Sequence, residues 1–366
     1  MELINATRMA AAYTMGMEPS GRELLVVVVK GTFHLPKNGE EVRLHEVQLP
    51  LVMADTFTGA PGLTAPYYEV DFAPRKHYCD VLLQGSAYAP DGRPAARVPV
   101  GIRIGNWMKI FAVVGDRYWQ SGFRGVTASA PIPFTVKPIS YDVAFGGTDT
   151  RHMDPQKHAA YMRNPVGRGY HRHLKSDWID GGPLPNTEEL KRAVVSPDGD
   201  FSPMAFGPIG RGWEPRLQFA GTYDKDWLDN HFPFLPLDFD EKYYQAAPID
   251  QQLSGSPCGM PVSLVNLSAD GTNNFLLPRM ETPVHIFTRD GKSEELTAVP
   301  DTLLFEPDAK RFAITWRATW SLRNGLFDVL HVLVGRPEST WQINREQTST
   351  LDVRGSEIVD RDGGLR

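Results

Sequence analysis

The sequence predicts a mainly β protein, with antiparallel sheets in two sandwich-like lobes, a long irregular middle rich in Gly, Pro and aromatic residues, and few short helices. Three observations support this class. Short apolar or alternating segments recur along the chain, turn residues separate them, and Gly (33) and Pro (30) are abundant among the 366 residues. Hydrophobic residues make up 41% and charged residues 22%, so the chain can bury a full core.

The first half contains the clearest strand signals. Residues 23–34, ELLVVVVKGTFH, are rich in Val and precede a Pro-Lys-Asn-Gly turn, so we expect a strand that enters a hairpin. A similar order of apolar run, Gly and turn recurs around Gly85, which predicts a second hairpin of like design. Residues 97–105 alternate and 109–114 do so less cleanly, so with 80–89 they predict an antiparallel meander.

The middle of the chain differs from both ends. Residues 150–212 hold few aliphatic side chains and many loop formers, with single helical turns predicted at 154–162 and 187–192. A long loop region inside a compact domain is usually functional.

The chain is expected to form one domain. Strand signals return from Pro261 onward at regular spacing. We therefore expect a single domain over residues 1–345, with β-rich lobes at 20–147 and 208–345, and a flexible tail at 346–366 because that segment has little apolar content.

Composition narrows the possible functions. A net charge of −6 gives no support for nucleic-acid binding. Cys79 and Cys258 are too few for a metal cluster, and we interpret them as reduced thiols. The N-terminus has no basic or long apolar stretch, and the longest apolar run, Leu24 to Val29, is too short to span a bilayer. We therefore expect a cytoplasmic protein that binds no membrane.

Four histidines lie close together in the sequence: His152, His158, His171 and His173. On a strand, the last two would share a face and could bind a transition metal. No cysteine or H-E-x-x-H helix accompanies them, however, so we interpret them as solvated loop residues and expect no metal site.

A catalytic nucleophile is not evident. No G-x-S-x-G elbow occurs. Cys79 follows His77 by two residues, which would allow a thiolate–imidazole pair on a strand, but we favour a small core residue beside a surface histidine.

The most informative segment is 208–252, which contains nine large aromatic residues between repeated prolines and aspartates. The aromatic residues are Trp213, Phe219, Tyr223, Trp227, Phe232, Phe234, Phe239, Tyr243 and Tyr244. They could bury on the order of 1,800 Å², about the area of a standard protein–protein interface. The segment therefore either wraps into its own small core or meets a partner.

The acidic residues of this segment allow a second interpretation. Six of them lie between residues 224 and 241: Asp224, Asp226, Asp229, Asp238, Asp240 and Glu241. A pair of them among aromatic platforms could act as a glycosidase pair. Acids in loops more often serve as helix caps and turn formers, which is the interpretation we favour.

Two turns share a Gly-Arg-Gly-aromatic core, VGRGY (166–170) and IGRGWEPR (209–216). Gly on both sides lets the backbone turn, while Arg reaches an acid or stacks on a ring. We interpret both as structural turns of the irregular middle.

Several rare strings occur in a fixed order: GDRYW (115–119), PIPF (131–134), YDVAFGG (141–147), NPVGRGY (164–170), PIGRGWEPR (208–216), AGTYDKDW (220–227), FPFLPLDFD (232–240) and AAPIDQQ (246–252). In these strings the chain resembles bacterial proteins that carry the domain of unknown function 2169, and the resemblance spans roughly residues 70 to 345. Members of that family resemble adaptors, or effector chaperones, of the type VI secretion system. Some relatives carry C-terminal pentapeptide repeats, which are not found here.

The resemblance implies a non-enzymatic protein with no catalytic residues and no cofactor. It would bind a type VI effector, linked to a PAAR domain, and help load it onto the VgrG spike. The expected partner-binding residues are Trp227, Asp226, Asp229, Phe232, Phe234 and Tyr243. The expected structural residues are Asp116, Arg117, Trp119, Asn164, Pro165, Gly167, Arg168, Gly169, Trp213, Arg216, Asp224, Asp250 and Gln251.

Two alternatives remain open from the residues alone. One is an enzyme that acts on a cell-envelope glycan or peptide through the aspartates or the histidines. The other is a carbohydrate-binding module without chemistry.

Overall fold

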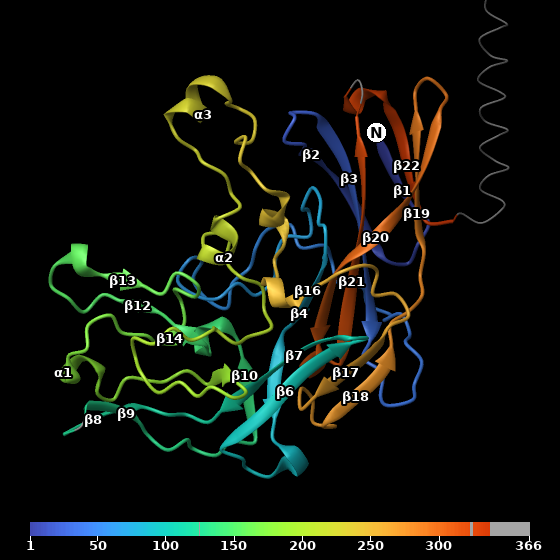
Figure 1. Ribbon diagram of the computed structural model, residues 1–366. Helices are drawn as coiled ribbons and strands as arrows, with labels where there is room; N and C mark the ends of the chain where they lie inside the picture. The colour runs from blue at the N-terminus through green and yellow to red at the C-terminus, as the bar shows by residue number, and fades with distance from the viewer. Residues whose placement is uncertain (124, 323–324, 337–366) are drawn as a thin grey trace, which may run out of the picture.

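The computed structural model describes residues 1–123, 125–322 and 325–336 (Figure 1). It confirms the predicted mainly β class, because antiparallel sheets dominate and the α-helices α1 (Ser176–Ile179), α2 (Glu214–Leu217) and α3 (Lys225–Asn230) are short. No helix in this part of the chain is long and apolar enough to cross a membrane. The predicted tail, 346–366, lies outside the described residues.

The largest sheet is nearly closed and barrel-like. Its main path runs through β1 (Glu2–Asn5), β22 (Val329–Val334), β19 (Thr282–Thr288), β20 (Ser293–Glu306), β21 (Arg311–Ser321), β3 (Glu23–His34) and β2 (Ala10–Met17). Beside this path, β4 (Cys79–Leu83) pairs in parallel with β20 and antiparallel with β16 (Gln252–Leu253).

β3 lies next to the end strand β2 of this sheet, and both of its faces are apolar. Leu25, Val27 and Val29 face the main core, whereas Leu24 and its alternate neighbours pack under Leu51 on the other face. β21 pairs with β3 from Leu24 to His34, whereas β2 pairs with it only up to Lys30. Beyond Lys30 the returning chain takes the second edge, because Phe33 bridges to Leu44 and His45 N donates to Thr32 O at 2.8 Å. The predicted hairpin after residue 34 therefore forms, but only as this short bridge.

The second sheet has the order β15 (Thr187–Glu189), β7 (Trp107–Val114), β6 (Arg97–Ile104), β17 (Pro261–Val265) and β18 (Thr272–Leu276). The β6–β7 hairpin is confirmed. Its predicted neighbour, 80–89, is wrong, because β17 from the far end of the chain pairs with β6.

The predicted second hairpin, around Gly85, is also wrong. β4 joins the large sheet, whereas β5 (Gly85–Tyr88) pairs with β10 (Val136–Ile139). The turn after Tyr88 forms the short 3-10 helix η1 (Pro90–Gly92) instead of reversing the chain into a partner strand.

The irregular middle has small sheets and a core of its own. Its pairs are β8 (Trp119–Gly122) with β9 (Gly125–Ala128), β11 (Phe145–Gly146) with β14 (Arg168–Gly169), and β12 (Thr148–Asp149) with β13 (Ala159–Ala160). Trp119, Phe145 and Ile179 anchor its separate apolar cluster.

Of the two predicted helical turns, one forms as a 3-10 turn and the other is a strand. The turn near residue 154 is confirmed only as η3 (Pro155–Lys157), capped by Asp154, which accepts a hydrogen bond from Gln156 N at 3.0 Å. The turn at 187–192 is wrong, because β15 begins there and buries Thr187 and Glu188 against β7.

Candidate partner-binding surface

Residues 218–241 form a projecting arm, here called the aromatic arm, with α3 near its tip (Figure 1, yellow). α3 starts at Asp224, whose carboxylate accepts a hydrogen bond from Trp227 N at 2.9 Å. The two limbs of the arm are joined by Asp240 N, which donates to Phe219 O at 3.1 Å, and by Thr222 N, which donates to Asp238 Oδ1 at 2.9 Å. The arm is therefore ordered by its own contacts.

Trp227 is the internal core of the arm. Its indole Nε1 donates to Phe234 O at 2.9 Å. Its ring packs edge-on against Tyr223, with centroids 4.8 Å apart, and against Phe232, with centroids 5.7 Å apart. Trp227 is half-buried by these contacts and holds its aromatic neighbours in place.

Around Trp227, large apolar side chains face solvent. Phe232 is 63% exposed and Leu237 82% exposed, and Tyr223, Leu228 and Phe234 are also exposed. Monomeric proteins rarely gather so many apolar side chains on one projecting element unless it meets a partner. Sequence reasoning missed Leu228 and Leu237, because an isolated Leu gives no sign of exposure.

The arm is also strongly acidic. Asp226 and Asp229 are exposed on α3, and Lys225 is the only Lys or Arg in residues 218–241. Asp226 accepts a hydrogen bond from Asn230 Nδ2 at 2.7 Å, whereas Asp229 makes no hydrogen bond or ion pair with any described residue. The backbone N–H of Thr222 lowers the pKa of Asp238, so this carboxylate stays charged at neutral pH.

The structure uses Asp224, Asp238 and Asp240 as caps and turn formers, as the favoured interpretation of these acids predicted. Asp240 accepts from Lys242 N at 2.9 Å, at the start of η4 (Glu241–Tyr244).

Two arginines anchor the base of the arm. Arg216, on α2, is almost fully buried and pairs with Glu69 at 3.0 Å while donating to Tyr243 O at 2.9 Å. Arg211 pairs with Asp55 at 2.7 Å. Burial opposes ionisation of Asp55, but the hydrogen bond from Arg211 outweighs it and lowers the pKa.

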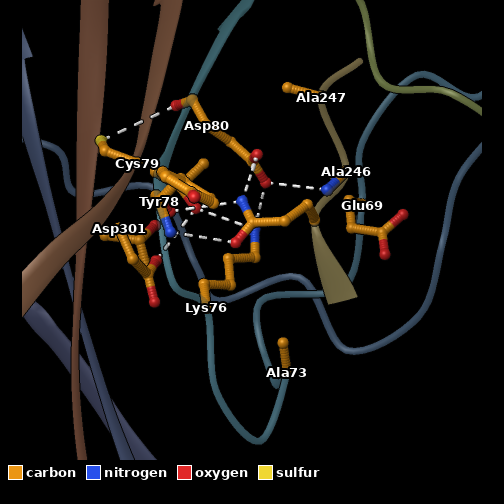
Figure 2. A network of polar contacts seen from close by, with 12 residues as sticks. Glu69, Ala73, Lys76, Tyr78, Cys79, Asp80, Ala246, Ala247 and Asp301 are labelled. Carbon is orange, nitrogen blue, oxygen red and sulfur yellow. Dashed lines mark hydrogen bonds and ion pairs between the residues drawn. The ribbon is translucent and has the colours of Figure 1, made fainter. Parts of the chain in front are cut away.

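A buried network next to η4 ties the base to β4 (Figure 2). Asp80 is fully buried and pairs with Lys76 Nζ at 2.7 Å. The same carboxylate accepts hydrogen bonds from Gln245 Nε2 at 2.7 Å and from Ala246 N at 2.8 Å. The arm is thus fixed to the large sheet by interactions that water does not reach.

Tyr243 lies at the base of the arm, apart from the exposed tip. It is half-buried against Phe239 and Tyr244, and the guanidinium of Arg216 lies over its ring. Burial raises the pKa of Tyr244 to about 12. Of the six expected partner-binding residues, the structure gathers Trp227, Asp226, Asp229, Phe232 and Phe234 in the arm and places Tyr243 below them.

The expected structural residues around 116–119 fix the irregular middle to the second sheet. Arg117 is buried and pairs with Glu188 of β15 at 2.9 Å. Asp116 accepts a hydrogen bond from Lys137 at 2.9 Å, which lowers its pKa. Trp119 is fully buried and donates to Gly169 O at 3.2 Å.

The NPVGRGY segment is held by close backbone packing. Asn164 is fully buried and donates to Tyr141 O at 2.9 Å, and Pro165 O accepts from the Thr148 hydroxyl at 3.0 Å. A Cβ on Gly167 would lie 2.3 Å from Asn164 Nδ2, so no side chain fits there. Gly169 has φ +94°, a conformation that favours glycine.

The prediction that each Gly-Arg-Gly arginine reaches an acid or a ring is confirmed for Arg211. Arg168 forms no ion pair or ring contact with any described residue, although Asp116 attracts its guanidinium at longer range; burial is the stronger effect and lowers its pKa.

Trp213, Asp250 and Gln251 lie in or beside the main core. Trp213 packs edge-on against Tyr141 with centroids 5.3 Å apart. Gln251 donates to Val81 O at 2.9 Å and accepts from Lys109 Nζ at 2.6 Å. Lys109 also pairs with Asp250 at 2.8 Å, and burial lowers its pKa.

The four histidines do not assemble as metal ligands in the described part of the chain. The rings of His152 and His173 are 5.1 Å apart, but His158 Nε2 contacts His152 O and His173 Nε2 contacts Lys157 O. A different group, His34, His45 and Glu46, has ligand atoms within 4.8 Å of one another. The sequence hides this group because a turn separates His34 from His45.

The thiols are free, and Cys79 is buried, which confirms its interpretation as a core residue. Burial raises its pKa well above the usual range, so it is no activated nucleophile. His77 pairs with Glu241 at 2.9 Å instead.

Comparison with known proteins places the chain in one family. The family described as "Uncharacterized protein conserved in bacteria (DUF2169)" matches residues 20–317, most of the chain. No curated protein and no solved structure matches this chain. The chain therefore belongs to the DUF2169 family.

Proposed function

We propose that this chain is a non-enzymatic adaptor, or effector chaperone, of type VI secretion. It binds an effector linked to a PAAR domain and helps load it onto the VgrG spike. The observation that carries the proposal is the aromatic arm, which presents Phe232 and Leu237 to solvent on a fixed support.

The support matters as much as the exposed side chains. Buried pairs at the base, Arg216 with Glu69 and Asp80 with Lys76, hold the arm in place before a partner arrives. A preorganised surface loses less conformational entropy on binding. Aromatic side chains are also the residue type that dominates interface energetics.

The charge of the arm favours a partner with basic residues around an apolar pocket. Asp226 and Asp229 would face such a rim and accelerate association. An adaptor that acts before secretion works in the cytoplasm, and it needs neither nucleic acid nor a membrane.

The test is co-expression of the full chain with the effector, PAAR and VgrG proteins encoded beside its gene, followed by size-exclusion chromatography. The double variant Phe232→Ala with Leu237→Ala should weaken a co-eluting complex at least tenfold, as expected for anchor residues. Leu276→Ala is the matched control, since Leu276 is 62% exposed on β18, outside the arm. Absence of any complex, or equal loss in the control, overturns the proposal.

A further inference from the structure

The large sheet is nearly closed, but its two end strands do not pair. β1 runs parallel to β22, and every later step to β2 is antiparallel, so β1 and β2 run in opposite directions. They follow each other through residues 6–9 and could close the barrel as a hairpin. Within the described ranges, however, no ladder joins them, which leaves a seam with β1 on one side and β2 on the other.

The ladder between β2 and β3 shows which backbone groups of β2 face the seam. Glu18 N donates to Arg22 O at 2.9 Å at the end of this ladder, and hydrogen-bonded pairs alternate from there. The residues between, Ala11, Tyr13, Met15 and Met17, therefore direct N–H and C=O toward the seam. Apart from the Thr14 hydroxyl, 3.5 Å from Met15 O, no described residue hydrogen-bonds to these backbone groups.

The chemistry of this edge favours added strands. β2 reads AAAYTMGM, with no charge and no proline, and its register with β3 is unbroken. Edge strands normally carry charges, prolines or bulges that block pairing with other chains.

The side chains at the seam are also incompletely covered. Tyr13 and Met15 pair with Val27 and Leu25, so they lie on the core face of the sheet. Nevertheless they are 36% and 38% exposed. The seam thus leaves backbone hydrogen-bonding groups without a partner among the described residues, and core-facing apolar side chains only partly covered.

We propose that the seam accepts one extended segment of the partner protein, which adds to β2 as a strand. Its core-facing side chains would be apolar and the alternate ones polar, to match the pleat of β2. This inference deepens the proposed adaptor function and rests on it for the identity of the partner.

Two features favour a partner segment over a second copy of the chain. β1 forms the other side of the seam, so we expect a single extended strand to enter it more readily than the edge of another folded sheet. The aromatic arm also reaches the end of the seam, since a Cβ on Gly21, in the turn after β2, would lie 2.8 Å from the Phe234 ring. One partner chain can therefore contact β2 and the arm together.

Amide hydrogen exchange on the full chain tests the edge directly. In the free protein, the amides of Ala12, Thr14 and Gly16 should exchange slowly, and those of Tyr13 and Met15 quickly. The probe is an acetylated peptide of alternating Val and Thr with a Lys at each end. Saturating peptide should slow exchange at Tyr13 and Met15 and leave the other three amides unchanged.

Two variants separate this strand pairing from non-specific binding. Tyr13→Pro removes an outward N–H that the β2–β3 ladder does not use, and should weaken peptide binding about fivefold, the effect of one hydrogen bond. Met15→Lys keeps the backbone and places a charge at the seam, and should weaken binding about tenfold. Thr14→Lys, on the opposite face, is the control and should change nothing.

Other outcomes overturn the inference. Protection of Tyr13 and Met15 that grows with protein concentration assigns the seam to a second copy, and protection that vanishes on truncation after Arg336 assigns it to this chain. Failure of the peptide to slow exchange removes the site altogether. If an effector binds and the seam variants bind it equally well, the inference fails while the adaptor function stands. If the peptide binds and no effector does, the adaptor function fails while the strand site stands.

Discussion

Replacing Asp80 with Asn should destabilise the protein more than most single substitutions. Asp80 is fully buried and pairs with Lys76, whose side chain is 3% exposed. In Asp80→Asn, the Lys76 ammonium loses its charged partner and keeps only neutral acceptors, the Thr302 hydroxyl at 3.0 Å and the new amide oxygen at position 80. Removing one member of a buried pair costs about 3–5 kcal/mol, because the other charge stays buried without compensation. That loss is a large part of the roughly 5–15 kcal/mol by which domains are stable.

Urea unfolding of the full chain, followed by tryptophan fluorescence, measures this loss. Asp198→Asn is the control, since Asp198 is exposed, and its effect should stay within about 0.5 kcal/mol. Adding Lys76→Met to Asp80→Asn removes the buried charge that has lost its partner. The loss of unfolding free energy in the double variant should therefore be smaller than the sum of the two single losses by at least about 1 kcal/mol. A loss below about 1 kcal/mol in Asp80→Asn, or strict additivity in the double variant, would show that the charge of Lys76 does not depend on Asp80 for compensation.

Three further predictions follow from burial, backbone conformation and charge. In the native protein, a thiol reagent should modify Cys258 quickly and Cys79 only after unfolding, because Cys79 is buried; equal rates would contradict this. Gly21→Ala should lower the unfolding free energy more than Gly39→Ala. Both glycines have φ above +80°, but only at Gly21 would the new Cβ meet the Phe234 ring. Equal losses in the two variants would show that the contact between Gly21 and Phe234 does not contribute to stability. Burial acts to raise the pKa of Asp149, yet backbone N–H groups of His173, Arg151 and Arg172 outweigh it and hold the pKa below 3.8. The contribution of the Asp149 carboxylate to the unfolding free energy is therefore complete above about pH 4 and is lost as the pH falls through the lowered folded pKa. Urea unfolding at a series of pH values should show a smaller loss of stability at acid pH in Asp149→Asn than in the native protein, and an equal loss in both would contradict this prediction.

Local pattern predicted the strands well and their partners poorly. The Val-rich segment that became β3 and the alternating segment that became β6 are visible from side-chain periodicity alone. That β17 would pair with β6 is not, because register depends on residues far away in the chain.

Charged residues within strands were the second difficulty. Lys30 lies in a strand and reads as a solvent-facing residue, yet it is buried and pairs with Asp71 at 2.9 Å. Arg317 likewise pairs with Asp301 inside the protein at 2.5 Å. Each pairing is created by the tertiary structure and leaves no trace in local sequence.

The aromatic segment 208–252 was identifiable from the sequence, but which of its rings are buried and which are exposed was not. Trp213 is buried while Phe232 is exposed, although both stand among prolines and charged residues. Only the position of the arm relative to the sheets separates anchoring rings from exposed ones.

The central claim, that the exposed face of the aromatic arm binds an effector, is tested most directly by calorimetric titration of the purified effector into the purified chain. We expect a saturable complex that Phe232→Ala with Leu237→Ala weakens at least tenfold, with an unchanged melting temperature and no effect of Leu276→Ala. Full affinity in the arm variant, with the fold intact, would contradict it.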